Sequence, residues 1–340
     1  MSFTPTPTAL ALDNSFLAPG NKRLIRGQWF FPENMSPLPT TTIGSLSRFD
    51  PDLHKSIEHA LAFQREHRLD VLTDGEQRTD MISYFAESFA GLAVENGTPL
   101  VEGLISLRGA PEDFSKVKDL DFIRSRYPDL KVKVALTGPT TLGMTCASKK
   151  IKSHYRNIMD FALYEDIATA LAPLAKALVD RGALVQIDEP FLSSGHRDIE
   201  ARVDLLDFLA KGLPKEKMSV HVCGFIGRPR LVDDLLELEN YSILSFGFAG
   251  RVETPNIDHV AKDFSGHAKK LGAGCIKVTP LSEKDVDTPQ EVSQRLARIA
   301  SKVGRENIAY AHPDCGMRAT DKSLVPIILR NMRAGVDLFG

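Results

Sequence analysis

The sequence predicts an α/β protein of the (β/α)8 TIM-barrel type. Eight short runs of apolar and β-branched residues recur along the 340-residue chain, and amphipathic helical patterns lie between most of them. This alternation favours parallel strands, because parallel neighbours need a crossover connection. Eight repeats of such a unit are typical of a sheet that closes into a barrel. An open doubly wound sheet is the alternative, although no glycine-rich dinucleotide fingerprint follows the first run.

The eight runs begin after the first forty residues and continue almost to the C-terminus. In chain order, the predicted strands are residues 40–45, 70–76, 133–138, 184–190, 219–224, 242–248, 275–280 and 308–316. Apolar residues recur at helical spacing over 53–68, 164–182, 231–240 and 289–304. Gly304 stands where the last of these helices needs a C-cap.

Two parts of the chain fall outside this repeat. Residues 1–37 are rich in Pro, Thr and Asn and show little periodicity, so we interpret them as an N-terminal arm. Residues 86–132 are more than one crossover helix requires, which predicts an insertion after the second strand. We therefore expect a single barrel domain over residues 38–340.

Charge and cysteine content limit the classes of function. The chain has 42 Lys and Arg against 44 Asp and Glu, which argues against nucleic acid as a partner. No apolar run approaches the roughly 20 residues that cross a bilayer, and the N-terminus does not resemble a secretory signal. These features predict a cytoplasmic protein without a membrane partner. The four cysteines are then expected to be free thiols or metal ligands.

Nearly every predicted strand ends in side chains of the kinds that bind ligands or act in catalysis. They are Ser45, Asp74, Glu76, Thr137, Asp188, Glu189, His221, Cys223, Asp314 and Cys315. The carboxyl ends of barrel strands meet at one face, where active sites are built. We therefore expect these residues to surround one site.

A zinc site is predicted by one histidine and two cysteines. His221 and Cys223 stand two apart in a predicted strand, so their side chains point to the same face. Cys315 ends the last strand, and one imidazole with two thiolates suits Zn²⁺. The alternative, about equally favoured by spacing alone, is that both cysteines are small buried residues and His221 is a core histidine.

Such a zinc would have three protein ligands and an open position, as catalytic zinc sites do. A thiol bound there loses its proton and becomes a nucleophile at neutral pH. The expected chemistry is therefore alkyl transfer to sulfur.

The acidic residues at the strand ends have two interpretations. Asp74, Glu76, Asp188 and Glu189 can act as general acids and bases or hold a cationic group, and paired carboxylates favour capture of an ammonium group. We assign Glu76 and Asp188 to the catalytic set. The alternative for Glu189, which precedes a proline, is a structural role at a helix N-terminus.

Six motifs in order, TTTIGS, TDGE, LTGPTTL, QIDEP, HVCG and HPDCGM, resemble the C-terminal catalytic barrel of cobalamin-independent methionine synthase. The resemblance covers the chain from about residue 38 and is closest to the stand-alone core form. The wider superfamily includes uroporphyrinogen decarboxylase and zinc methyltransferases that act on coenzyme M. The resemblance therefore implies a zinc-dependent methyltransferase.

The family's residue roles can be placed on this chain motif by motif. The resemblance implies that His221, Cys223 and Cys315 bind zinc. It further implies that homocysteine is held by four residues, namely Ile43, Ser45, Glu76 and Asp188. It leaves the methyl donor open between methylcobalamin, which a corrinoid protein would carry, and methyltetrahydrofolate.

One residue departs from the family pattern. Gly247 in LSFGFA stands where the family usually supplies a glutamate zinc ligand, and Glu253 is the nearest acidic residue that follows. Two alternatives therefore stay open. One is alkyl transfer to another thiol, of the coenzyme M or epoxide-opening kind, and the other is a non-catalytic barrel that binds a corrinoid protein.

Overall fold

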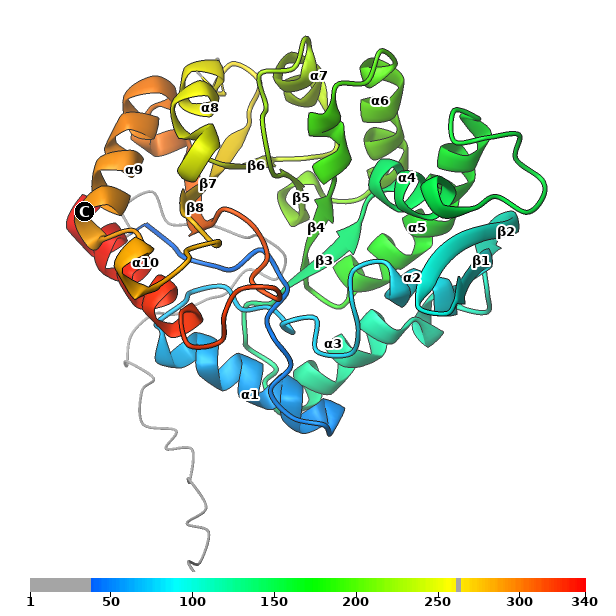
Figure 1. Ribbon diagram of the computed structural model, residues 1–340, viewed down its shortest axis with the longest axis horizontal. Coiled ribbons are helices and arrows are strands. Elements are labelled where there is room, and N and C mark those ends of the chain that lie inside the picture. The colour runs from blue at the N-terminus through cyan, green and yellow to red at the C-terminus, as the bar shows by residue number, and fades with distance from the viewer. Residues whose placement is uncertain (1–37, 261–263) are drawn as a thin grey trace, which may run out of the picture.

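The computed structural model describes residues 38–260 and 264–340, so the predicted arm at 1–37 lies outside the described residues. Six parallel strands form one sheet at the centre of the molecule, with helices around it (Figure 1). In the order in which they pair, the strands are β3 (Lys133–Thr137), β4 (Leu184–Asp188), β5 (Met218–Val222), β6 (Ile243–Gly247), β7 (Lys270–Ile276) and β8 (Ile308–Pro313).

Isolated parallel bridges continue the sheet and close it into a barrel. Thr40 pairs with Ala311 of β8, and the next residue, Thr41, pairs with Val71. Leu72 pairs in turn with Val132, directly before β3. The two segments that carry these bridges occupy the places of the first two barrel strands, which confirms the predicted TIM-type architecture.

These first two segments extend less far than predicted, because a side chain replaces the next ladder partners. Gln64 lies on α1 (Leu53–Glu66). Its Oε1 accepts the backbone N–H of Thr73 at 3.0 Å, and its Nε2 donates to the Thr73 carbonyl at 2.8 Å. The backbone groups of Thr73 are thereby satisfied without a strand partner.

Nine further helices accompany the strands. They are α2 (Ser83–Ser88), α3 (Ser115–Arg126), α4 (Pro139–Lys149), α5 (Ala162–Asp180), α6 (Ile199–Ala210), α7 (Leu231–Glu237), α8 (Glu253–His259), α9 (Pro289–Val303) and α10 (Val325–Phe339) among the described residues. The four helical patterns read from the sequence correspond to α1, α5, α7 and α9. Thr288 and Glu291 form a capping box at the start of α9, and Gly304 ends it with φ of 83°, as predicted.

The predicted insertion contains an antiparallel hairpin of β1 (Phe89–Glu95) and β2 (Thr98–Leu107), followed by α3. Asn96 and Gly97 form the turn with positive φ angles of 50° and 74°, which suits a two-residue hairpin loop. The Tyr155 hydroxyl accepts the backbone N–H of Ile105 at 2.9 Å and ties the hairpin to the barrel. The hairpin lies beside α4 and α5 (Figure 1).

The position of β7 differs from the sequence prediction of 275–280. Glycines weaken strand propensity, but here the barrel needs them. A Cβ on Gly272 would lie 2.7 Å from Tyr310 Cε2, and a Cβ on Gly274 would lie 2.6 Å from the Phe246 carbonyl oxygen. Close packing against both neighbouring strands therefore places β7 earlier in the chain than propensity indicates.

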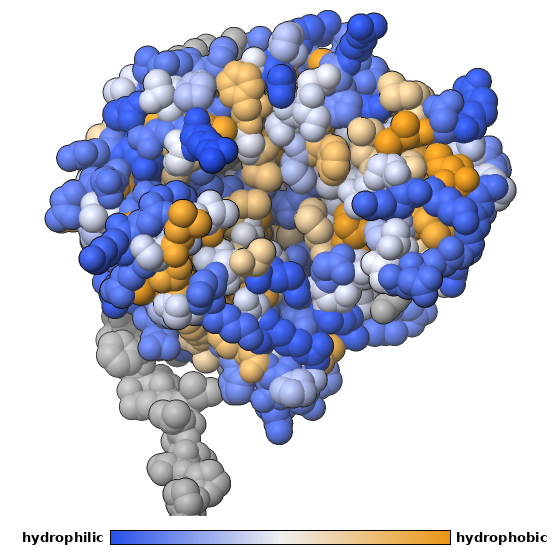
Figure 2. Space-filling view, viewed as in Figure 1, coloured by the Kyte–Doolittle hydropathy of each residue, from blue (hydrophilic) through white to orange (hydrophobic). Residues whose placement is uncertain are grey.

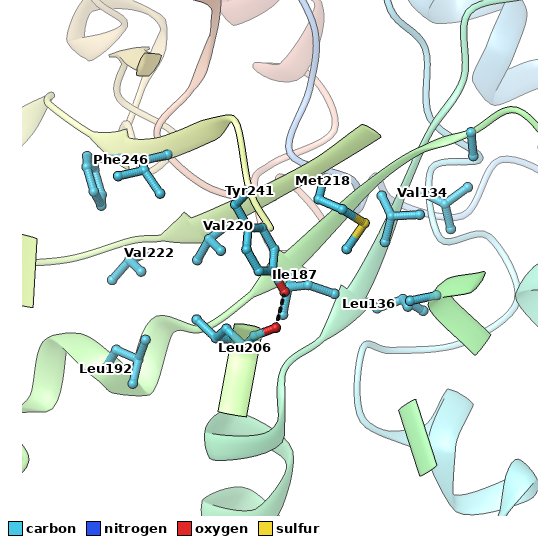
Figure 3. Packing of buried hydrophobic residues seen from close by; sticks show 14 of the residues in the cluster. Val134, Leu136, Ile187, Leu192, Leu206, Met218, Val220, Val222, Tyr241 and Phe246 are labelled. Atoms are coloured by element: carbon cyan, nitrogen blue, oxygen red, sulfur yellow. Dashed lines mark hydrogen bonds between the residues drawn. The ribbon is translucent and has the colours of Figure 1, made fainter. Parts of the chain in front are cut away.

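The two faces of the sheet carry different side chains. One face packs apolar residues against the surrounding helices, and the Tyr241 hydroxyl there donates to the Leu206 carbonyl at 3.0 Å (Figure 3). Many of the residues that alternate with them are polar and equally buried, beside a small apolar cluster that includes Leu184 and Ile243. This second set comprises Lys133, Gln186, Ser219, His221, Ser245, Tyr310 and His312. A polar interior is unusual for barrel strands, which mostly fill this space with branched apolar residues.

The outer surface is mainly hydrophilic at its periphery, whereas neutral and apolar side chains gather nearer the centre of the same view (Figure 2). Within the described part of the chain, none of the helices combines the length and apolar character that crossing a membrane requires.

The packing of Gly272 generates a stability prediction. Gly272→Ala forces a methyl group to within 2.9 Å of Ser245 Cβ as well as against Tyr310. Such overpacking is expected to lower the free energy of unfolding by ~1–3 kcal/mol in urea denaturation. Gly103→Ala in β2 is the control, because its Cβ would meet only Ser153 Oγ at 3.8 Å. Equal stability of the two variants would contradict the packing account.

Candidate active site

The predicted histidine and two cysteines come together at the carboxyl ends of the strands. His221 lies in β5, Cys223 follows that strand directly, and Cys315 follows β8. One ligand atom from each residue lies within 4.8 Å of the other two. In the sheet register, His221 pairs with Asp188 on one side and with Ser245 on the other. The barrel thus brings together residues that lie far apart in the chain, since Asp188 and Cys315 are 127 positions apart.

The imidazole of His221 has one nitrogen engaged and one free. Its Nδ1 lies 2.9 Å from Ser245 Oγ. Its Nε2 is buried and has no hydrogen-bond partner among the described residues. A buried polar atom without a partner is costly. A cation at this point would satisfy Nε2, and the residues therefore fit a metal ion.

The two cysteine sulfurs behave as a pair. A hydrogen bond from the Cys223 thiol lowers the pKa of Cys315, and the same bond raises the pKa of Cys223. The donor set of one nitrogen and two sulfurs matches the preference of Zn²⁺.

Asn256 holds the loop that carries Cys223. Its side-chain Nδ2 donates to the carbonyls of Gly224 at 2.7 Å and Gly247 at 2.8 Å, and its Oδ1 accepts the Ile226 N–H at 3.0 Å. Gly224 has φ of 92°, a conformation that other residues rarely adopt. No sequence motif includes Asn256, because the residue lies on α8 and reaches the loop only in the folded chain.

No side chain at position 247 takes the place of the glutamate that the resemblance implies. The carboxylate of Asp314 lies beside this point, 3.2 Å from where a Gly247 Cβ would be, but its oxygens accept the backbone N–H groups of Phe248 and Ala249. Glu253 does not take over as a ligand, because its two oxygens bond Arg295 at 2.8 Å and Arg298 at 2.6 Å. The cluster therefore offers three protein ligands.

A cavity of about 930 Å³ opens beside the cluster. Its lining includes Cys223, Cys315 and Gly247, so a ligand in the cavity reaches both sulfurs. Lys277 lines it as well, and its Nζ donates to Asp285 Oδ1 at 2.6 Å. The absence of a side chain at position 247 adds to the space next to the two sulfurs.

Asp188 stands next to His221 in the barrel interior. Its Oδ1 accepts the Nε2 of Gln186 at 2.7 Å, and the same Nε2 donates to the Ile43 carbonyl at 3.0 Å. Lys133 Nζ donates to Gln186 Oε1 at 2.6 Å. Burial raises the pKa of the Asp188 carboxyl group. Gln186 thus links the predicted substrate residues Ile43 and Asp188.

Glu76 has a partner that the sequence analysis missed. Lys116 Nζ donates to Glu76 Oε1 at 2.7 Å, and both side chains are buried. Burial alone lowers the pKa of Lys116, but the Glu76 carboxylate outweighs it and keeps the lysine charged. Lys116 belongs to α3 of the insertion, and no pattern in the sequence connects it with the site.

Ser45 reaches the same region through contact with Gly316. A Cβ on Gly316 would lie 2.2 Å from Ser45 Oγ, and the Met317 N–H donates to the Ser45 carbonyl at 2.8 Å. A Cβ on Gly44 would lie 3.9 Å from Glu76 Cγ. The first motif therefore lies between the residue after Cys315 and the Glu76 carboxylate.

Glu189 takes the structural role rather than a place in the site. Its Oε1 accepts the N–H of Thr140 at 2.8 Å, and its Oε2 accepts the N–H of Thr141 at 2.8 Å and that residue's hydroxyl at 2.7 Å. Both threonines lie in the first turn of α4. Glu189 therefore satisfies the unpaired amides of a helix N-terminus.

The fold and this side-chain set define a class of α/β-barrel enzymes with a thiolate and imidazole site at the strand ends. A model of the family described as "Cobalamin-independent synthase, Catalytic domain" matches residues 42–337. The chain belongs to this family of methyltransferases. The family is cobalamin-independent, and the expectation of a corrinoid protein partner therefore receives no support.

Individual relatives agree with this membership. The methionine synthase of Methanothermobacter thermautotrophicus is 32% identical over 308 residues, which cover 88% of this chain and 93% of that protein. The 5-methyltetrahydropteroyltriglutamate–homocysteine methyltransferase of Thermotoga maritima is 26% identical over 88% of this chain and 44% of its own length. A B12-independent methionine synthase from Shewanella sp. W3-18-1 shares the fold, with a TM-score of 0.73 at 22% identity, covering 89% of this chain and 98% of that chain.

The cluster generates a prediction about metal content. Wild-type protein purified with zinc is expected to hold roughly one ion per chain. Cys315→Ala should lose it, because one of three ligands is gone. Cys275→Ala is the matched control, since Cys275 is a buried cysteine on β7 outside the cluster. Atomic absorption of the dialysed proteins measures the content, and full zinc retention in Cys315→Ala would refute the assignment.

Proposed function

We propose that the protein is a zinc-dependent methyltransferase that transfers a methyl group to the thiol of homocysteine, giving methionine. The observation that carries this proposal is the convergence of His221, Cys223 and Cys315, with their ligand atoms within 4.8 Å. These residues would hold the zinc, and a bound zinc lowers the pKa of an acceptor thiol so that the nucleophilic thiolate forms at neutral pH.

The side chains around the cluster suit an amino-acid thiol. Asp188 keeps one carboxylate oxygen, Oδ2, outside its bond with Gln186, and this oxygen is available to an ammonium group. Glu76 contributes a second carboxylate, with Oε2 outside its bond to Lys116. In this proposal the Ser45 hydroxyl binds the carboxylate of the same substrate. In this role the two acids orient the acceptor.

Family membership supports a methylated pterin as the methyl donor. A cobalamin-independent synthase favours a methylated pterin, and the relative from Thermotoga maritima carries methyltetrahydropteroyltriglutamate in its name. The methyl group leaves the pterin nitrogen and bonds to sulfur, and the pterin nitrogen takes up a proton. The cavity beside Cys223 and Cys315 leaves room for a donor to approach the acceptor sulfur.

A methyl-transfer assay tests the proposal. Zinc-loaded protein is offered homocysteine with either methyltetrahydropteroyltriglutamate or methylcobalamin, and methionine is measured. We expect methionine with the pterin donor and none with Cys315→Ala. Transfer from methylcobalamin alone would contradict the donor, whereas no methionine from either donor with zinc-loaded protein would contradict the function.

The ion pair of Glu76 with Lys116 favours a second candidate, in which the acceptor is a thiol without an ammonium group. The lysine neutralises one of the two carboxylates that would hold homocysteine. Cobalt-substituted protein distinguishes the candidates, because a thiol that binds the ion changes its visible absorption. We expect homocysteine to change the spectrum. A response to 2-mercaptoethanesulfonate but not to homocysteine would favour the second candidate.

A further inference from the structure

A continuous line of hydrogen bonds runs behind the His221 imidazole, away from the cysteines. His221 Nδ1 lies 2.9 Å from Ser245 Oγ, and Ser245 Oγ lies 2.9 Å from His312 Nε2. His312 Nδ1 lies 2.8 Å from the Pro313 carbonyl oxygen. All three side chains of this line are buried. The line links β5, β6 and β8, and neither the family assignment nor the proposed function requires it.

The direction of every bond follows from its last member. A carbonyl oxygen only accepts, so His312 Nδ1 carries a proton and donates to Pro313. In a neutral imidazole the other nitrogen, Nε2, is then an acceptor, and the Ser245 hydroxyl must donate to it. Because the Ser245 hydroxyl has only this one proton, its oxygen accepts a hydrogen bond from Nδ1–H of His221.

His312 is held in the neutral form that this direction requires. The His312 side chain is fully buried, and burial in the low-dielectric interior disfavours the charged imidazolium. The ring of His312 stands nearly perpendicular to that of His221, with centroids 5.7 Å apart. No other tautomer of His312 can bond both the serine and the carbonyl.

The barrel makes room for this line at a specific place. Ser245 and His312 lie on β6 and β8, and β7 runs between them. In the register, Ser245 faces Gly272, and His312 faces Gly274. A Cβ on Gly272 would lie 3.1 Å from Ser245 Oγ. Gly272 on β7 therefore leaves room for Ser245 and His312 to meet across the intervening strand.

We propose that Ser245 and His312 are positioning residues that fix His221 in the tautomer with its proton on Nδ1. The lone pair is then on Nε2, the nitrogen that is buried without a partner beside the two cysteines. Outer partners of this kind commonly orient a ligating histidine. The role of this tautomer in metal binding rests on the proposed function, whereas the tautomer itself can be observed in the metal-free protein.

Nuclear magnetic resonance tests the tautomer directly. The full-length, metal-free protein is labelled with ¹⁵N-histidine, and the nine histidines are resolved by their long-range ¹⁵N–¹H correlations. The His221 signal is identified by its loss in His221→Gln. We expect a protonated His221 Nδ1 in wild type, and a mixture with the Nδ1-unprotonated form in Ser245→Ala. An unprotonated Nδ1 in wild-type His221 would overturn the proposal, and this result needs no variant at the serine.

Zinc affinity provides the second readout. Ser245→Ala is expected to bind zinc roughly 10- to 100-fold more weakly in competition with a chromophoric chelator. Ser219→Ala is the matched control, because Ser219 is an equally buried serine on β5 whose hydroxyl donates to the Val185 carbonyl at 3.3 Å. Equal affinities in the two folded variants would overturn the proposal. Failure of the wild-type protein to bind zinc would refute the proposed function. It would leave the tautomer untouched, because the tautomer is measured in the metal-free protein.

Discussion

The site depends on the burial of polar side chains inside the barrel. Successive strand residues point to opposite faces, so the apolar residues that pack against the helices leave polar residues pointing inward. A buried polar group is stable only with a hydrogen-bond partner, and this requirement links Lys133 to Gln186 and Ser245 to His312. Two atoms of this inner set stay without a partner among the described residues, namely the Tyr310 hydroxyl and His221 Nε2. Of the two, only Nε2 belongs to the cluster with Cys223 and Cys315, and it marks the point where the chain is prepared for a ligand.

Small residues determine how closely these groups approach. Gly272 keeps β7 free of a side chain beside Ser245, Gly274 lets β7 approach the Phe246 carbonyl, and Gly316 lets Ser45 approach the Cys315 loop. Gly247 differs from these three. Its missing side chain adjoins the cavity, and a metal ion bound by the three ligands would have a less anionic donor set than with a glutamate at this position. Glycine thus allows close packing of the interior at three positions, and at the fourth, position 247, it changes which side chains can reach the metal site.

The sequence predicts the barrel and the position of the cluster because both depend on local patterns. Buried parallel strands are usually apolar throughout, whereas SVHV alternates polar and apolar residues. The same alternation in the neighbouring strands places Gln186 and Ser245 on the inner face. Lys116 and Asn256 had no such signal, since each comes from a helix that tertiary packing brings to the site. The strand around Gly272 was misplaced because the close contacts that favour glycine there are visible only after folding.

The ligand set of the bound ion tests this account most directly. X-ray absorption at the zinc edge of the metal-loaded protein resolves sulfur from nitrogen neighbours. Two sulfurs at about 2.3 Å and a histidine nitrogen at about 2.0–2.1 Å are expected. A zinc environment of oxygen and nitrogen alone would show that Cys223 and Cys315 do not hold the ion, and it would contradict the account.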